Sequence, residues 1–324
     1  MRKFVHLNAQ AIDEAVSVLQ KYGTKATVIA GGTDLLGKMK DEILPRYPEV
    51  IINLKSIPGL DFIREEEGML RIGALTRLED IATDPLVRSK YTALAEAAHR
   101  TASPHIREMG TIGGNLCQDI RCWYYRNPHN RFPCLRKGGG RCYAIEGDNR
   151  YHSLFDSSVK GGCLAVHPSD TAPALIAVDA MIKTSKRLIR AEDFFEVDVT
   201  KTTVLEQDEI VTEIRIQAVP ADTKSAFVKF ATRKTIDFPI VNCAAMMTIS
   251  GGKVSGARIC LNAVYVKPYR ALKAEESIRG KVIDETTAKA AAEAAVFDAK
   301  PLRHNRYMVQ IAKTMVERAI LACR

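Results

Sequence analysis

The stretch VIAGGTDLL, residues 28–36, does most to constrain the fold. An apolar, strand-like run leads into Gly31 and Gly32, and a helical segment follows the two glycines. Around this stretch, the N-terminal third alternates strand-like runs such as KFVHL and EVIINL with helical segments such as AIDEAVSVLQKYG. This alternation predicts a βα-rich domain rather than an all-β domain.

The second part of the chain has a different pattern. CLAVHPSDTAPALIAVDAMI, residues 163–182, predicts a strand, a turn and a helix, and QAVPADTKS, residues 217–225, indicates a domain boundary. The strand-like runs AFVKFATRK, IVNCAAMMTI and ARICLNAV follow, and two helical segments, 284–299 and 305–322, close the chain. We therefore expect an α+β protein with domains at 1–218 and 219–324, the second an antiparallel sheet covered by helices.

Composition and charge exclude some classes of function. The chain has 324 residues, 46% hydrophobic and 26% charged, as in ordinary soluble proteins of two domains. It has no run approaching the roughly 20 apolar residues of a membrane span and no secretory signal at its start, so we expect a cytoplasmic protein. The net charge of +9 is scattered and matches no nucleic-acid-binding pattern. It indicates a solvated basic surface or a docking face for an acidic protein.

Two glycine-rich loops are candidate anion sites. Gly31 and Gly32 let backbone N–H groups approach an anion, and Thr33 adds a hydroxyl group. GTIGGNL, residues 110–116, repeats this chemistry. Neither loop is GxGxxG, so a Rossmann site is not indicated. Each loop alone is also compatible with a plain tight turn, whereas the pair favours a dinucleotide held between them.

Five motifs in order resemble one family over essentially the whole chain. VIAGGTDLL, IGALTRLEDI, REMGTIGGNL, HPSDTAPALIAVDA and FVKFATRKTIDFPIVNCA are similar to the FAD-binding subunit of molybdenum hydroxylases. The resemblance implies a PCMH-type FAD-binding domain of two α/β subdomains and an α+β C-terminal domain. It also implies an FAD site, with Ala74 and Thr76 near the flavin ring. The implied FAD-binding residues are Ile29, Ala30, Gly31, Gly32, Thr33, Asp34, Thr111, Gly113, Gly114, Asn115, Asp170 and Lys229.

The segment 117–163 departs from the common family pattern. It has little periodicity and contains several of the eight cysteines, which a cytoplasmic protein keeps reduced. From Cys122 the spacing is C-x11-C-x7-C-x20-C, unlike zinc ribbons or the ferredoxin run. Free thiols, a zinc site and an iron–sulfur cluster all remain candidates on spacing alone. Between Arg121 and Arg150, seven basic residues face two acidic ones, a net charge of +5 that suits an anionic cluster.

A subset of the family resembles this segment closely. Those flavin subunits, of 4-hydroxybenzoyl-CoA reductase and certain aldehyde oxidoreductases, carry a [4Fe–4S] cluster in an insertion at this point. The resemblance implies the ligands Cys122, Cys134, Cys142 and Cys163 and leaves Cys117 out. The remaining cysteines, Cys243, Cys260 and Cys323, lie at apolar positions and are expected to be buried structural residues.

The resemblance also implies a function. We expect an electron-transfer subunit that passes electrons between FAD, its extra cluster and two [2Fe–2S] clusters on a small partner subunit. A large molybdopterin-binding subunit would act on an aromatic acyl-CoA, an aldehyde or an N-heterocycle, with ferredoxin or NAD(P) as external electron partner. The alternatives are a self-contained NAD(P)H-dependent flavin oxidoreductase, for which no nicotinamide fingerprint is present, and a zinc-stapled binding protein.

Overall fold

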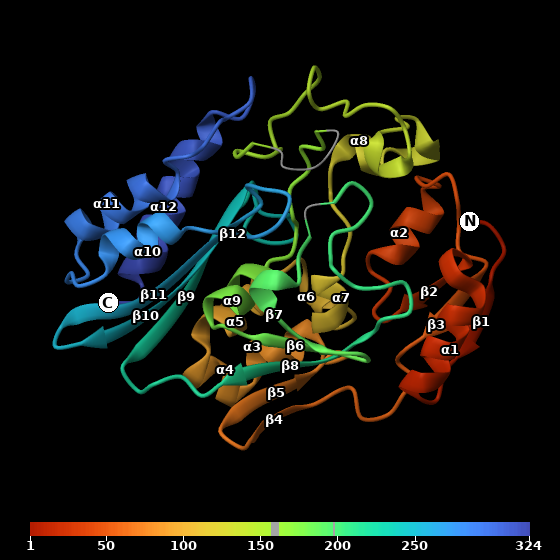
Figure 1. The fold of residues 1–324 in the computed structure, drawn as a ribbon, viewed down its shortest axis with the longest axis horizontal. Helices are drawn as coiled ribbons and strands as arrows, with labels where there is room; N and C mark the ends of the chain where they lie inside the picture. Colours follow the sequence, from red (N-terminus) through yellow and green to blue (C-terminus); the bar gives the residue numbers. More distant parts are fainter. Residues whose placement is uncertain (157–161, 197) are drawn as a thin grey trace.

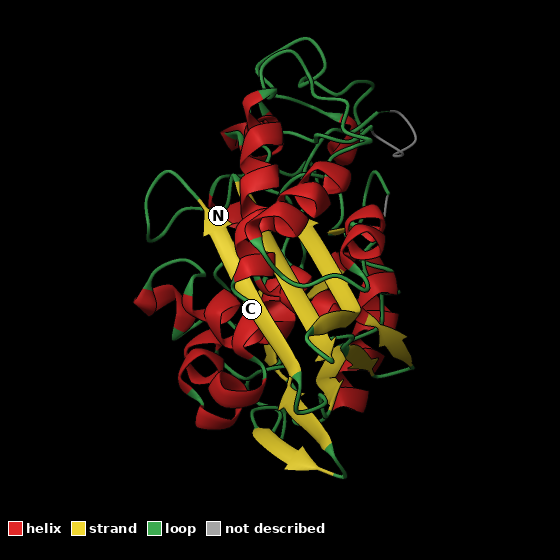
Figure 2. Cartoon of the chain, turned by 90° about the vertical axis from the view of Figure 1, so that its left-hand side faces the viewer, coloured by secondary structure: helices red, strands yellow, loops and turns green. Residues whose placement is uncertain are grey.

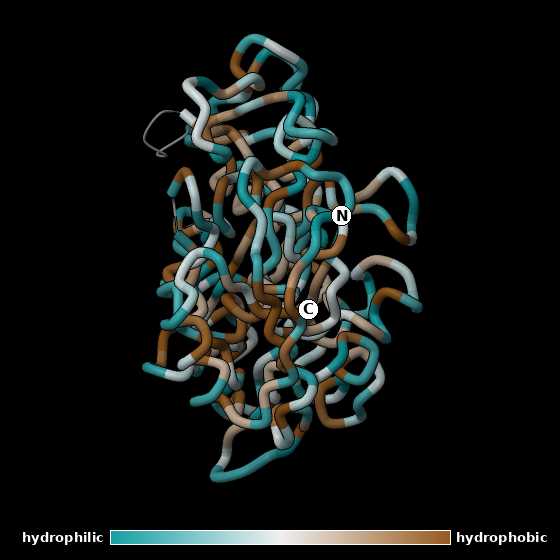
Figure 3. The backbone as a smooth tube through the Cα atoms, turned by 90° about the vertical axis from the view of Figure 1, so that its right-hand side faces the viewer, coloured by the Kyte–Doolittle hydropathy of each residue, from teal (hydrophilic) through white to brown (hydrophobic). Residues whose placement is uncertain are grey.

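The computed structural model describes residues 1–324 except 157–161 and 197. Its three sheets divide the chain into an N-terminal subdomain, a central subdomain and a C-terminal domain (Figure 1). Helices and strands are mixed throughout, as Figure 2 shows, which confirms the expected α+β class. The most hydrophobic segments run through the interior, and hydrophilic segments form much of the outer loops (Figure 3).

The N-terminal subdomain is a small parallel α/β unit. Its strands are β1 (Val5–Asn8), β2 (Ala26–Ile29) and β3 (Val50–Asn53), and both β1 and β2 pair with β3. Its helices are α1 (Ile12–Tyr22) and α2 (Leu35–Lys40), with the short turn η1 (Gly23–Lys25) between α1 and β2. Ala15 and Leu19 of α1 pack on Val50 and Ile52 of β3. This packing fixes the end of β2, from which the first glycine loop continues.

The central subdomain is a five-stranded antiparallel sheet with helices against it. The sheet order is β4-β5-β8-β6-β7, and the strands are β4 (Ile63–Glu66), β5 (Met69–Gly73), β6 (Met181–Thr184), β7 (Leu188–Arg190) and β8 (Val211–Gln217). The other elements are α3 (Leu78–Thr83), α4 (Pro85–Lys90), α5 (Thr92–His99), α6 (Pro104–Arg107), α7 (Ile112–Leu116), α9 (Thr171–Ala177) and η4 (Ala191–Asp193). The strand expected around 163–166 is instead irregular backbone outside any sheet, bonded to loops through Leu164 and His167.

The C-terminal domain is an antiparallel sheet covered by helices, as expected. The sheet order is β12-β11-β10-β9, with β9 (Thr223–Phe230), β10 (Val241–Ser250), β11 (Lys253–Asn262) and β12 (Tyr269–Arg270). The helices are α10 (Leu272–Ile278), α11 (Glu285–Ala295) and α12 (Tyr307–Leu321).

Both faces of the C-terminal sheet are buried. Ala244 of β10 and Cys260 of β11 belong to the core of the central subdomain, whereas Cys243 and Ala245 belong to the core under the C-terminal helices. Burial on both faces explains why β10 reads as a continuous apolar run rather than an alternating one. Cys243, Cys260 and also Cys323 are buried, in agreement with the sequence analysis.

The insertion forms a separate layer beside α2. Its described residues are mostly loop, with α8 (Trp123–Arg126), η2 (Pro128–Asn130) and η3 (Leu135–Lys137). Figure 1 shows it above α2, and the His129 N–H donates a hydrogen bond to the carbonyl of Asp41 at the end of that helix. Across the described part of the chain, the helices are all too short or too polar to cross a membrane.

Candidate functional site

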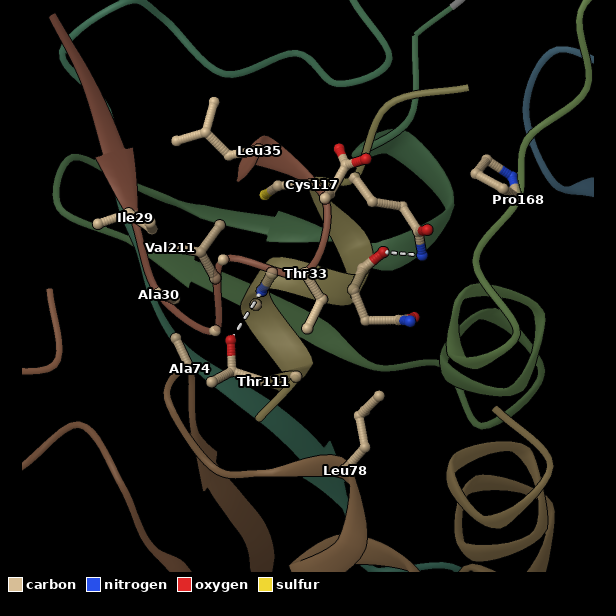
Figure 4. A pocket seen from close by; sticks show the side chains of 18 of the residues that line it. Ile29, Ala30, Thr33, Leu35, Ala74, Leu78, Thr111, Cys117, Pro168 and Val211 are labelled. Carbon is tan, nitrogen blue, oxygen red and sulfur yellow. Dashed lines mark hydrogen bonds between the residues drawn. The ribbon is translucent and has the colours of Figure 1, made fainter. Parts of the chain in front are cut away.

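A cavity of about 510 Å³ lies between the N-terminal and central subdomains. Figure 4 shows side chains from both subdomains around it: Ile29 and Thr33 come from the N-terminal subdomain, and Ala74, Thr111 and Val211 from the central one. A cavity of this size is typical of a small-molecule or cofactor site. The two glycine loops therefore face the same space, as their sequences suggested.

The two glycine loops are packed so closely that side chains are excluded between them. A Cβ atom on Gly31 would lie 2.0 Å from the carbonyl oxygen of Met109, at the start of the second loop. Gly32 has a φ of +73°, a left-handed conformation that favours glycine. In the second loop, a Cβ atom on Gly113 would lie 2.9 Å from the carbonyl oxygen of Ala74.

The loops differ in the hydrogen-bond donors that they leave free. Within the described part of the chain, the backbone N–H groups of residues 30–34 donate no hydrogen bond. In the second loop the N–H of Gly113 already donates to Ala74, and that of Gly114 to the Thr111 hydroxyl. These residues are half-buried or exposed at the cavity, so their free N–H groups make the first loop the one equipped to bind an anion. The second loop instead contributes close backbone packing against the first loop.

All but one of the expected FAD-binding residues line this cavity. They are Ile29, Ala30, Gly31, Gly32, Thr33, Asp34, Thr111, Gly113, Gly114, Asn115 and Asp170. Lys229 lies behind Asp170 instead, with its Nζ 2.7 Å from the carboxylate. Of the two residues expected near the flavin ring, Ala74 lines the cavity, whereas the Thr76 hydroxyl is bonded to the backbone of Phe62.

Asp34 also connects the cavity to the insertion. Its carboxylate accepts hydrogen bonds from the Asp119 N–H at 2.9 Å and from Arg126 at 2.7 Å, and forms an ion pair with Arg121. Burial opposes ionisation of Asp34, but the neighbouring arginines outweigh it and hold its pKa below the usual value. A residue expected to contact the cofactor is therefore also the anchor of the cysteine segment.

A loop of the C-terminal domain completes the cavity and was not singled out as a site from the sequence. Ile236, Asp237 and Phe238 line it. Ile236 has a φ of 71°, and its N–H donates to the carbonyl oxygen of Ala102. The Arg121 guanidinium lies 4.6 Å from the centre of the Phe238 ring. This loop falls inside the motif FVKFATRKTIDFP, which was the only available signal for it.

The four expected ligand cysteines surround a second, small cavity. Cys122, Cys134, Cys142 and Cys163 all line it, although up to 41 positions separate them in the chain. Cys117 lies apart from them, in the lining of the larger cavity (Figure 4). Among the described residues, no group of three or more His, Cys, Asp or Glu is arranged to hold a metal ion.

Several buried nitrogens around this small cavity lack partners. Arg136 lines it, and its Nε makes no hydrogen bond with a described residue. The Nζ of Lys137 also makes no hydrogen bond with a described residue. Burial lowers the pKa of Lys137, while the neighbouring thiols of Cys134 and Cys122 act in the opposite direction. An orphaned buried donor carries a substantial desolvation penalty. The Nε of Arg136 and the Nζ of Lys137 are therefore two donors near the thiols that an anionic group would satisfy.

His152 contacts one of the four thiols. Its Nε2 lies 3.3 Å from the Sγ of Cys122, and burial lowers the pKa of His152 to about 4, so the imidazole is neutral. Burial raises the pKa of Cys122 to about 12 and also raises that of Cys163. Without a metal the thiols of Cys122 and Cys163 are protonated, and a metal would bind them by displacing their protons.

Comparison with known families identifies both domains. Residues 2–218 match the family described as the FAD binding domain in molybdopterin dehydrogenase. Residues 226–323 match the CO dehydrogenase flavoprotein C-terminal domain. Together the two matches account for almost the whole chain.

Similar proteins agree with these matches. The chain is 31% identical to the carbon monoxide dehydrogenase medium chain of Hydrogenophaga pseudoflava, covering 99% of this chain and 96% of the relative. It is also 31% identical to the aldehyde oxidoreductase FAD-binding subunit PaoB of Escherichia coli K12, covering 100% and 99%.

Solved structures show the same fold. Carbon monoxide dehydrogenase from Hydrogenophaga pseudoflava, in a form lacking the Mo-pyranopterin moiety, matches with a TM-score of 0.78 and 30% identity over 99% of this chain and 97% of that one. Quinoline 2-oxidoreductase from Pseudomonas putida 86 matches with a TM-score of 0.75 and 25% identity over 99% and 97%. The chain therefore belongs to the family of FAD-binding flavoprotein subunits of molybdopterin-dependent dehydrogenases, which are oxidoreductases.

Proposed function

We propose that this chain carries two redox groups, an FAD in the larger cavity and a [4Fe–4S] cluster on Cys122, Cys134, Cys142 and Cys163. The observation that carries the proposal is the convergence of these four cysteines on one cavity, near two buried nitrogens without hydrogen-bond partners in the described part of the chain, the Nε of Arg136 and the Nζ of Lys137. Flavins exchange electrons in pairs with some partners and singly with metal clusters, which is the chemistry that FAD supplies in electron-transfer subunits.

The larger cavity suits FAD on structural grounds. The free N–H groups of residues 30–34, all of which line the cavity, would hold the pyrophosphate as backbone nests hold phosphates. Gly31 keeps the two loops in contact, and Asp170, held by Lys229, fixes the turn on the far side of the cavity. Ala74, Leu78 and Val211 supply apolar walls.

The cysteine cavity suits a cluster better than a single zinc ion. Zinc holds its four thiolates at about 2.3 Å, which requires their sulfurs to be close together. Among the described residues no three such ligands are arranged to hold a metal ion, and a [4Fe–4S] cubane is the four-thiolate group that we propose in place of zinc. The cationic side chains Arg136 and Lys137 offset the negative charge of four thiolates and a cluster.

A short stretch of chain links the two cavities. Cys163 lines the cysteine cavity and Pro168 the larger cavity, on one segment of irregular backbone. Five residues of extended chain span at most roughly 17 Å, so the two sites are near neighbours. This proximity supports direct electron exchange between them.

The partners follow from the family. We propose that a molybdopterin-binding large subunit converts the substrate, an aromatic acyl-CoA, an aldehyde or an N-heterocycle. A small subunit with two [2Fe–2S] clusters would connect it to FAD on this chain. The extra cluster would extend electron transfer to an external carrier such as ferredoxin, and NAD(P) is the alternative external partner.

The test is the cofactor content of the full chain purified without oxygen. We expect about one FAD and about four iron and four sulfide per chain. Cys134→Ser should lose most of the iron and retain FAD, because Cys134 lies outside the larger cavity. The matched control, Cys117→Ser, should retain the iron. FAD without iron in the wild-type chain, or equal iron content in both variants, would refute the cluster assignment.

A further inference from the structure

Lys137 is held inside the cysteine loop by the geometry of the turn that follows Cys134. Its N–H donates to the carbonyl oxygen of Cys134 at 2.9 Å, and the N–H of Gly139 donates to the same oxygen at 3.0 Å. Gly138, at a φ of +85°, ends η3, and a Cβ atom on Gly139 would lie 1.7 Å from the Pro133 carbonyl oxygen. The loop therefore closes tightly, and only 8% of Lys137 remains exposed.

The ammonium group of Lys137 has no partner in the described part of the chain. Its Nζ is buried without a hydrogen bond, and no carboxylate forms an ion pair with it. Asp119, a buried carboxylate of the same segment, is already engaged by Lys38, Arg136 and the Tyr125 hydroxyl. A buried ammonium without a counter-charge is strongly unfavourable, so a sequence that retains one there provides a partner by other means.

Lys137 follows Cys134 by three positions, and its backbone N–H is bonded to the carbonyl oxygen of that cysteine. Thiolates at Cys134 and Cys122 would stabilise its positive charge. We propose that the Lys137 ammonium is the counter-charge of the four-cysteine site, and that it hydrogen-bonds the sulfur of the group held there and raises the reduction potential of that group. This inference rests on the cluster proposed above and assigns Lys137 as a positioning residue for it.

The physical basis is the charge added on reduction. One electron passed from the flavin makes a cluster on four thiolates more negative by one unit, and a fixed positive charge within a poorly solvated site stabilises the reduced form more than the oxidised form. Lys137 thereby sets how readily electrons leave the flavin for the insertion. Arginine in its place would keep the charge, whereas methionine would keep only the length of the side chain.

The experiment compares three variants of the full chain, purified without oxygen. Lys137→Met removes the buried charge, Lys137→Arg keeps it, and Arg131→Met removes an exposed charge from the same segment as a matched control. The readouts are the midpoint potential from an EPR-monitored redox titration, the iron content and the FAD content. We expect a lower midpoint potential in Lys137→Met, values close to wild type in the other two, and unchanged FAD in all three.

The outcomes separate a failure of the Lys137 inference from a failure of the cluster assignment. A Lys137→Met chain that loses iron while Lys137→Arg retains it also supports the inference, because the charge is then needed for assembly. Equal midpoint potentials in Lys137→Met and Arg131→Met, or equal loss of iron from both Lys137 variants, overturn it while the cluster itself stands. An iron-free wild-type chain overturns the proposed function first, and this inference with it.

Discussion

The Nζ atom of Lys229 lies 2.7 Å from the Oδ2 atom of Asp170, and this buried ion pair joins the C-terminal sheet to the lining of the larger cavity. Asn242 of the neighbouring strand donates to the other carboxylate oxygen at 2.7 Å. Lys229 also donates to the carbonyl oxygen of Arg100. The resemblance had suggested a lysine close to the flavin; in the structure it fixes a turn that lines the site.

Lys229→Met should destabilise the protein by about 3–5 kcal/mol, because it leaves the Asp170 carboxylate buried without its counter-charge. Denaturant unfolding of the FAD-loaded chain measures the change. Lys224→Met, on the same strand at an exposed position, is the matched control and should change stability little. Adding Asp170→Asn to Lys229→Met should recover part of the loss. Similar stabilities for the Lys229 and Lys224 variants would argue against this role.

Gly31→Ala should sharply reduce FAD binding, since its Cβ would overlap the Met109 carbonyl oxygen at 2.0 Å and push the two loops apart. Gly37→Ala offers a control six residues later in α2, where a Cβ atom meets nothing within 4 Å. There alanine should be neutral or stabilise the helix by up to about 1 kcal/mol. Flavin absorbance after gel filtration distinguishes the two. Full FAD retention in Gly31→Ala would mean that the loops do not hold the cofactor by close contact.

Asp34→Asn should weaken the insertion although it touches none of the four cysteines. It removes charge from the carboxylate that binds the Asp119 N–H, Arg126 and Arg121, at a cost of about 2 kcal/mol. We expect iron to be released to a chelator several-fold faster than from the wild-type chain. Asp41→Asn, at an exposed position at the end of α2, serves as the comparison. Equal release rates in the two variants would show that the anchor does not support the cysteine site.

His167 should make stability depend on pH. It is fully buried, and burial lowers its pKa to about 3, below the roughly 6.5 of an unfolded histidine. The unfolded state therefore binds a proton that the folded state does not, and stability is lost as the pH falls below about 6.5, by about 1.4 kcal/mol per pH unit.

Unfolding midpoints of wild type and His167→Gln between pH 7 and pH 5 measure this effect. Buried His152, whose pKa is lowered to about 4, adds a similar slope to both proteins, so the difference between them isolates His167. The variant should have the shallower dependence. Parallel curves would mean that His167 takes up a proton in the folded state.

The features predicted from the sequence are those that depend on residues close together in the chain. Gly31 and Gly32 follow an apolar strand, and the cysteine segment has no helical or strand periodicity, so both features can be recognised in the sequence alone. What it did not predict depends on contacts between distant residues. Nothing in the sequence distinguishes Lys137 from the six other basic residues of its segment, because only the turn at Gly138 and Gly139 buries it.

The same reason applies to other parts of the site. His152 reaches Cys122 across thirty positions, and Ile236 meets Ala102 from another domain. The apolar run at 163–166 has the composition of a strand, but it lies outside any sheet and connects the two cavities. Motif spacing singled out Asp34 and Lys229, yet the directions and partners of their side chains required the fold.

Electron capacity tests the central claim most directly. The full chain, purified without oxygen, is titrated with dithionite while flavin and cluster absorbance are followed. An FAD and one [4Fe–4S] cluster predict about three electron equivalents per chain, of which Cys134→Ser should lose about one. A wild-type chain that takes up only about two equivalents, with the same end point in Cys134→Ser, would contradict the account.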